Sequence, residues 1–216
     1  MSRIANLAFQ CLLVGLTAPL FCQEAPTTMT KITARIIKQE PVPGSFAAQP
    51  KTYWRAGTKY ARIAESPDLQ NHIQGLIIIR EPDAWMVNLS DKSGRHVIDS
   101  GPSLVVRLPI FDKQTGMKSK LNDLEFGMEL DFFVRNNATH SVGVVIDGNA
   151  TDRYEVVISD ARLVLWTDAK SKKPVRVSLV DGNQSRTFQY VSYDDQLPFD
   201  QSLFQPPSGI SIEEPK

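Results

Sequence analysis

The chain has 216 residues, of which 24 are basic and 24 acidic, so its formal net charge is zero. This balance gives no electrostatic attraction toward nucleic acid or an anionic membrane surface, and we expect no nucleic-acid partner. The length suits a single domain, and a hydrophobic content of 42% is ordinary for a globular protein.

The N-terminal segment differs from the rest of the chain. Arg3 is its only charged residue, and an apolar stretch from Leu7 to Phe21, interrupted by Gln10, follows it. This layout is typical of a secretory signal peptide and is short for a membrane span. No other stretch approaches about 18 apolar residues, the length that a transmembrane helix needs. We therefore predict a signal peptide over residues 1–22, export of the protein, and no transmembrane segment.

Both cysteines, Cys11 and Cys22, lie in or at the edge of this segment, so the mature chain has no disulfide framework. A domain of this length has a core large enough to fold without one. A bacterial lipobox would want a small residue before its cysteine, and Phe21 precedes Cys22, so lipid attachment is the less favoured alternative. We expect a flexible linker over residues 23–30, one domain over 31–212 and a tail over 213–216.

Most of the mature chain alternates apolar and polar residues with a period of two, which predicts β-strands. The alternating segments and two short apolar runs are residues 31–38, 59–64, 73–80, 84–89, 103–111, 153–159, 162–167, 174–180 and 186–193. Two Asp-Gly-Asn turns, at 147–149 and 181–183, tolerate the positive φ that tight hairpins need. Short connections between successive strands favour an antiparallel meander over a parallel sheet.

Residues 118–138 break this rhythm. Four apolar residues recur there at spacings of three and four: Leu121, Leu124, Met128 and Phe132. The spacing predicts one helix, capped at Ser119 or Asn122, although Gly127 weakens it by about 1 kcal/mol relative to alanine. A strand over residues 128–134 is the alternative.

A single sheet must bury its apolar faces, and one short helix can cover it only if the sheet curls around the helix. The predicted fold is therefore mainly β (α+β). We expect a strongly curved antiparallel sheet, or open half-barrel, of about ten strands with a helix packed on its concave face.

Two regions carry family-like patterns. In the first, a basic-aromatic strand (Tyr60 to Ile63) precedes an aliphatic strand (Leu76 to Ile79), a turn and a strand with Trp85. The second is the ending, where an acidic stretch leads to Leu-Phe, Pro-x-Gly and a short apolar edge strand: Leu203, Phe204, Pro207, Gly209, Ile210 and Ile212. Both patterns resemble the LolA/LolB-like family of periplasmic carriers and acceptors of lipoproteins.

The resemblance implies a bacterial periplasmic or outer-membrane-associated protein that binds a lipid or the acyl chain of a lipoprotein. An envelope protein is a second candidate partner. The expected apolar cavity lies between the sheet and the helix, with residues 112–136 as a lid. Its expected lining is Ile36, Trp54, Ile63, Ile77, Trp85, Leu124, Met128, Phe132, Phe188 and Tyr190. If these residues are plain core instead, the protein is an envelope interaction module with a filled core and no ligand.

The sequence offers no catalytic residue. It has no G-x-S-x-G, P-loop or dinucleotide fingerprint. The histidines His72, His96 and His140 are scattered, so we expect no metal site and no cofactor. A hydrolase, the least supported hypothesis, would need His96, Asp99 and a serine in one cleft. We expect a non-enzymatic protein.

Overall fold

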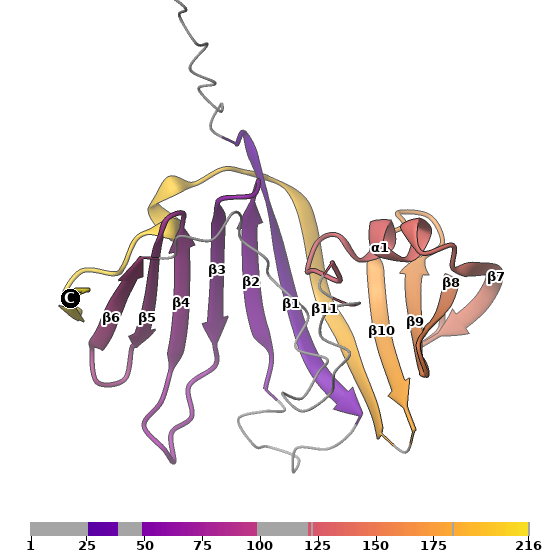
Figure 1. Ribbon diagram of the computed structural model, residues 1–216, viewed down its shortest axis with the longest axis horizontal. Coiled ribbons are helices and arrows are strands. Elements are labelled where there is room, and N and C mark those ends of the chain that lie inside the picture. The colour runs from indigo at the N-terminus through magenta and orange to yellow at the C-terminus, as the bar shows by residue number, and fades with distance from the viewer. Residues whose placement is uncertain (1–25, 39–48, 99–120, 122, 183, 216) are drawn as a thin grey trace, which may run out of the picture.

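The computed structural model describes residues 26–38, 49–98, 121, 123–182 and 184–215 (Figure 1). Twelve strands and one α-helix lie in these residues. The first six strands are β1 (Thr28–Lys38), β2 (Lys51–Ala56), β3 (Tyr60–Glu65), β4 (Gly75–Arg80), β5 (Asp83–Asn88) and β6 (Ser93–Ile98). The helix α1 (Glu129–Arg135) follows, and the remaining strands are β7 (Thr139–Ile146), β8 (Asn149–Ile158), β9 (Ala161–Asp168), β10 (Pro174–Asp181), β11 (Gln184–Pro198) and β12 (Ser211–Glu213).

The strands form one open sheet in the order β12-β6-β5-β4-β3-β2-β1-β11-β10-β9-β8-β7. Two antiparallel meanders, β1 to β6 and β7 to β11, meet where β1 pairs with β11. The short β12 returns to the far edge and pairs with β6 in parallel. Because β12 and β7 are the two ends of this order, the sheet does not close. The prediction of a mainly β, open antiparallel sheet is confirmed.

The number of strands corrects the expectation of about ten. Every alternating segment among the described residues overlaps a strand, and Trp54 was expected in a strand although the bounds of β2 were not predicted, whereas β6 and β7 were missed. The sequence of β6 opens with Ser93-Gly94, which is typical of a turn, and Gly143 interrupts the pattern of β7. The expected signal peptide and the run 103–111 lie outside the described residues. Strand β1 begins at Thr28, so three residues of the expected linker belong to the sheet.

The hairpin between β7 and β8 has the predicted turn. Asp147 and Gly148 adopt φ values of 51° and 81°, the positive pair that a two-residue hairpin requires. The β10–β11 turn likewise has Gly182 at a φ of 54°. Turn chemistry in the sequence was therefore a sound guide to where these strands reverse. No helix among the described residues is both long and apolar enough to span a membrane.

The helix is shorter than predicted. It spans Glu129–Arg135, so neither Ser119 nor Asn122 caps it, and the strand alternative over residues 128–134 is also wrong. Gly127 has a φ of 85°, outside the helical region, which is why the helix begins only after it. Leu124 still reaches the core, from a turn rather than from a helix, and is 1% exposed.

The sheet carries one apolar cluster on each face. Tyr53 belongs to the cluster that packs under α1, whereas its neighbour Trp54 packs against the other cluster, as alternation along a strand requires. We call these the helix face and the strap face. The strap, residues 199–213, leaves β11 and runs back over the β1–β6 half to end at β12 (Figure 1).

Aromatic side chains fix the strap on its face. Phe204, in the 3₁₀ helix η3 (Gln201–Phe204), is fully buried, and its ring centroid lies 5.4 Å from that of Tyr60. Phe199 approaches the same tyrosine at 5.0 Å. Arg62 donates from Nη1 to the carbonyl oxygen of Leu203 at 2.7 Å. The Pro-rich ending therefore replaces a second layer on the strap face.

Candidate functional site

The structure does not bring the ten expected cavity residues together. Six lie in or against the cluster on the helix face: Ile36, Ile63, Leu124, Phe132, Phe188 and Tyr190. Trp54 and Trp85 lie on the opposite face, against the strap cluster. Ile77 is on the helix face, paired with Ile63, but beyond that cluster. Met128 precedes α1 and is 38% exposed.

Side chains fill the space beneath α1 in the described part of the chain. Phe126 stacks on Tyr53 with ring centroids 3.9 Å apart and meets Phe188 edge-on at 6.5 Å. Phe132 and Phe133 are 1% and 0% exposed. Such close aromatic packing is the geometry of a core. Beneath α1, the plain-core alternative therefore describes these residues better than an open cavity does.

A buried carboxyl group lies at the centre of this packing. Glu129 in α1 is 1% exposed, accepts a hydrogen bond from the Tyr190 hydroxyl at Oε1 (2.7 Å), and accepts another from the Gly127 amide at Oε2 (3.0 Å). Burial raises the pKa of Glu129 to about 7, against the opposing effect of these hydrogen bonds and of Arg55. Burial, together with Glu129, also raises the pKa of Tyr190.

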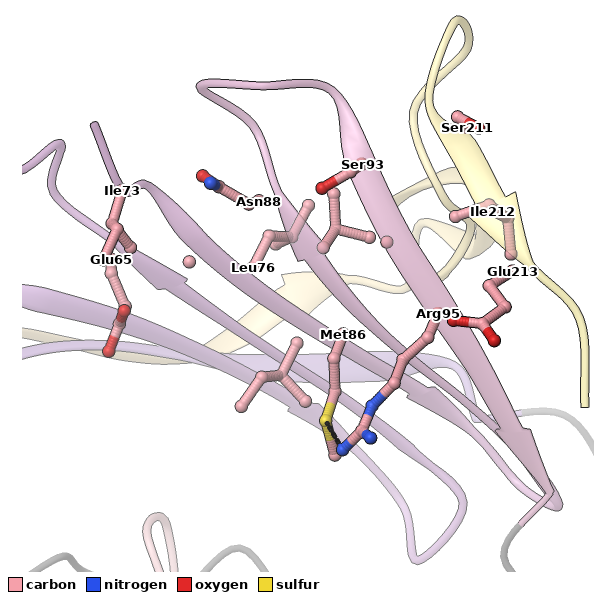
Figure 2. A pocket seen from close by; sticks show the side chains of 14 residues that line it. Glu65, Ile73, Leu76, Met86, Asn88, Ser93, Arg95, Ser211, Ile212 and Glu213 are labelled. Carbon is pink, nitrogen blue, oxygen red and sulfur yellow. Dashed lines mark hydrogen bonds between the residues drawn. The ribbon is translucent and has the colours of Figure 1, made fainter. Parts of the chain in front are cut away.

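An open space lies away from α1, at the β4–β6 end of the sheet. It is a groove of about 800 Å³ (Figure 2). Its lining comes from β3 to β6, the loop before β4, and β12: Glu65, Ile73, Gly75, Leu76, Ile77, Met86, Val87, Asn88, Ser93, Gly94, Arg95, Ser211, Ile212 and Glu213. A volume of this size falls in the range of small-molecule sites.

One row of paired residues connects this groove to the core. On the helix face Ile63 pairs with Ile77, Ile77 with Met86, and Met86 with Arg95. The same row begins in the core at Tyr53, which is 5% exposed, and reaches Met86 at 42% exposed. The row therefore passes from the buried core into a part of the face that no described residue covers, while remaining apolar until Arg95.

Arg95 ends the row with a positive charge. Figure 2 shows Met86 and Arg95 side by side, and Nη2 of Arg95 lies 3.2 Å from Sδ of Met86. Thioether sulfur is a weak acceptor, and within the described ranges Arg95 forms no ion pair. Two other polar side chains of the lining are engaged, since Glu65 pairs with Lys51 at 2.6 Å and Ser93 donates to Asp91. An apolar floor that ends at this guanidinium suits an amphiphile with an anionic head group.

The three histidines take separate places. His96 lies between Asp83 and Glu214, with each ring nitrogen 2.8 Å from a carboxylate oxygen. His140 lies 3.5 Å from Asp152, and His72 is exposed in a loop. No three metal-ligating side chains gather among the residues that the structure describes. Asp99, which the hydrolase hypothesis requires, lies outside those residues.

Sequence reasoning missed the groove residues Met86 and Arg95. The signal was present, because Trp85, Val87 and Leu89 occupy one side of their strand and so place Met86 on the other. A methionine on the expected polar face of a strand is an exposed apolar residue, and it suits an adaptable binding surface. The role of β12 as a groove wall depends on a contact between distant segments, which no local pattern contains.

Comparisons with known proteins match the fold only. No family model and no curated protein matches this sequence. An uncharacterized conserved protein from Thermus thermophilus shares 9% identity over 88% of this chain and 91% of its own, with a TM-score of 0.51. A LolA superfamily protein from Nitrosomonas europaea shares 10% identity over 86% of this chain and 92% of its own, with a TM-score of 0.31.

The Pseudomonas aeruginosa MucA/MucB complex contains a further match. It shares 12% identity over 84% of this chain and 56% of that one, with a TM-score of 0.40, so this chain spans about half of its length. The likeness to the Thermus protein shows a common fold. At 9% identity this likeness extends to the fold alone.

Proposed function

We propose that this chain is a non-enzymatic, exported protein of the bacterial envelope that binds the acyl chain of a lipid or lipoprotein. The binding site in this proposal is the groove at β4–β6, not the space beneath α1. The observation that carries it is the row Ile63, Ile77 and Met86, which continues the core into an open groove and ends at the cation Arg95.

Apolar burial would supply the binding energy. Removing one CH₂ group from water contributes about 0.8 kcal/mol, so several methylenes on Ile77 and Met86 would offset the cost of immobilising the chain. Arg95 would pair with an anionic head group at the end of the apolar floor. The signal-peptide pattern of residues 1–22 supports export.

The second candidate function is an envelope interaction module. The filled space beneath α1 favours it. So does the edge strand β7, where Val142 and Val145 are 71% and 67% exposed beside backbone groups that β8 leaves unpaired. A partner protein would then add a strand to β7, and the groove would remain without a lipid.

Native mass spectrometry tests the proposal. The mature chain would be purified from an exporting host without detergent, and bound material would be identified after organic extraction. An acyl lipid at defined stoichiometry supports acyl binding. A clean apo mass that stays unchanged after incubation with lipids and acylated peptides overturns it in favour of the interaction module.

A pair of matched variants locates the site. Met86→Glu places a carboxylate on the groove floor, whereas Val157→Glu makes the same change at another exposed strand position, which is 61% exposed. We expect Met86→Glu to weaken the binding of a dansyl-labelled fatty acid at least ten-fold and Val157→Glu to leave it unchanged. Equal binding by both variants would exclude the groove as the site.

A further inference from the structure

The wall of the groove formed by β12 is held by few contacts. The strand has three residues, and among the described residues it pairs with β6 alone; the Ser211 amide donates to the Lys92 carbonyl at 2.9 Å. Ile212 is the one residue of β12 that packs against the strap-face cluster. Such a short parallel pairing is weak by itself, so any further attachment matters for whether the wall stays in place.

His96 supplies that attachment. Its Nδ1 lies 2.8 Å from Oε2 of Glu214, directly after β12, and its Nε2 lies 2.8 Å from Oδ1 of Asp83 in β5. The imidazole stacks on Trp85 with ring centroids 5.0 Å apart and is 14% exposed. The ring is therefore fixed in orientation, with one carboxylate at each nitrogen.

Only a protonated ring can donate a hydrogen bond to both carboxylates. Imidazolium has two N–H donors, whereas neutral imidazole has one donor and one acceptor. An acceptor nitrogen 2.8 Å from a carboxylate oxygen is repulsive, so loss of the proton must release one partner. Asp83 has a second cationic partner, Arg80, at 3.5 Å, and lies in β5, which is paired on both sides by β4 and β6. Glu214 is 70% exposed, and His96 is its one ion-pair partner within the described ranges, so Glu214 is the group released.

We propose that His96 is a pH-dependent latch that closes β12 against the groove when protonated and frees it when neutral. When β12 is free, a ligand can enter the groove between β6 and β12. That this ligand is an acyl chain rests on the proposed function. The latch itself depends on the contacts of His96 with Asp83 and Glu214 alone.

The surrounding charges set the direction of the response. The hydrogen bond to Glu214 is the largest cause that raises the pKa of His96, and Asp83 acts in the same direction. Arg80, over the ring of Trp85, and Arg95 and Glu213, in the same hollow, are the other charged groups nearby. The attachment is complete below the ordinary histidine pKa of about 6.5 and is lost as the pH rises through the raised value.

Amide hydrogen exchange of β12 tests the latch without any ligand. Exchange at Ser211–Glu213, corrected for intrinsic rates, would be followed by NMR from about pH 5 to about pH 9, a range that brackets histidine titration. We expect protection to fall at least five-fold, with a midpoint that matches the titration of the His96 ring. Protection that stays constant with pH overturns the latch.

Two neighbouring carboxylates give matched variants. Glu214→Gln should show low protection of β12 at every pH, while the rest of the sheet stays protected. Glu213 lies in the same hollow, but the ring nitrogens of His96 contact Glu214 and Asp83 instead. In Glu213→Gln the protection of β12 should therefore still fall as the pH rises, as in wild type. The same pH response in Glu214→Gln as in wild type would overturn the role of Glu214.

Binding kinetics separate the latch from the proposed function. If the protection of β12 follows the titration of His96 but a dansyl-labelled fatty acid binds at no pH, the latch is supported and acyl binding is excluded. If the fatty acid binds with the same pH dependence in wild type and in Glu214→Gln, acyl binding stands and gating by β12 fails. Faster association at high pH in wild type, with no such change in Glu214→Gln, supports both.

Discussion

The hydroxyl of Tyr190 in β11 donates a 2.7 Å hydrogen bond to Oε1 of Glu129 in α1, and both side chains are buried. The Gly127 amide donates to the other oxygen of the same carboxyl group. A helix of seven residues gains little stability from its own hydrogen bonds. This pair therefore fixes α1 on the sheet together with the surrounding phenylalanines.

Glu129 should make the protein less stable as the pH rises. Burial raises its pKa to about 7, so the folded state retains a proton that the unfolded chain releases near the ordinary value of 4.5. The free energy of unfolding should therefore fall between about pH 4.5 and about pH 7, by about 3 kcal/mol at most. In Glu129→Gln this decline should disappear, and urea unfolding at about pH 8 should show the variant to be more stable than wild type. An unchanged pH profile in the variant would contradict this role.

The packing of Phe126 predicts a large loss of stability on truncation. Its ring contacts Tyr53, Phe188 and Tyr190, so Phe126→Ala should lower the free energy of unfolding by about 3–5 kcal/mol. Val134→Ala removes an apolar side chain from α1 that is 61% exposed, and its effect should stay within about 0.5 kcal/mol. Chemical denaturation measures both. Equal, small effects would mean that the space beneath α1 is not closely packed in solution.

Gly94 predicts a way to loosen β12 without touching His96. A Cβ there would lie 2.9 Å from the Met86 carbonyl oxygen and 3.1 Å from Cδ1 of Ile212. Gly94→Ala should therefore push Ile212 away and lower stability by about 1–3 kcal/mol. Amide exchange should speed up in β12 and leave β7, at the opposite edge, unaffected. Undiminished protection of β12 would show that β6 and β12 tolerate the methyl group.

Local patterns predicted the strands well and the helix poorly. Alternation found β5 because Trp85 and Val87 both face the strap cluster. The spacing of Leu121 and Leu124 with Met128 suggested a long helix, but the positive φ of Gly127 lets the helix begin only after that residue. Leu121 and Leu124 are buried all the same, since turns place them in the core. Periodicity thus predicted that these residues are buried in the core, but it did not predict whether they lie in a helix or in a turn.

The candidate site was harder to predict, because its geometry depends on contacts between distant segments. Trp54 and Trp85 were assigned to one cavity with Phe188 since all are aromatic residues in strands. The sheet separates them, because alternation along β2 and β5 places the two tryptophans on the strap face, opposite Phe188. The pairing of β12 with β6, across more than a hundred residues, likewise has no local signal.

Arg95 predicts the charge of the ligand. Its guanidinium ends the apolar row beside Met86, where the carboxylate of a fatty acid would pair with it. Arg95→Gln should weaken the binding of palmitate about five-fold, the effect of losing an exposed ion pair of about 1 kcal/mol. The binding of the uncharged methyl ester should not change, and Arg162→Gln, on β9, should bind both compounds as wild type does. Competition against a dansyl-labelled fatty acid measures the affinities of wild type and both variants for the two compounds. Equal losses for palmitate and its ester would mean that Arg95 contributes its aliphatic stem rather than its charge.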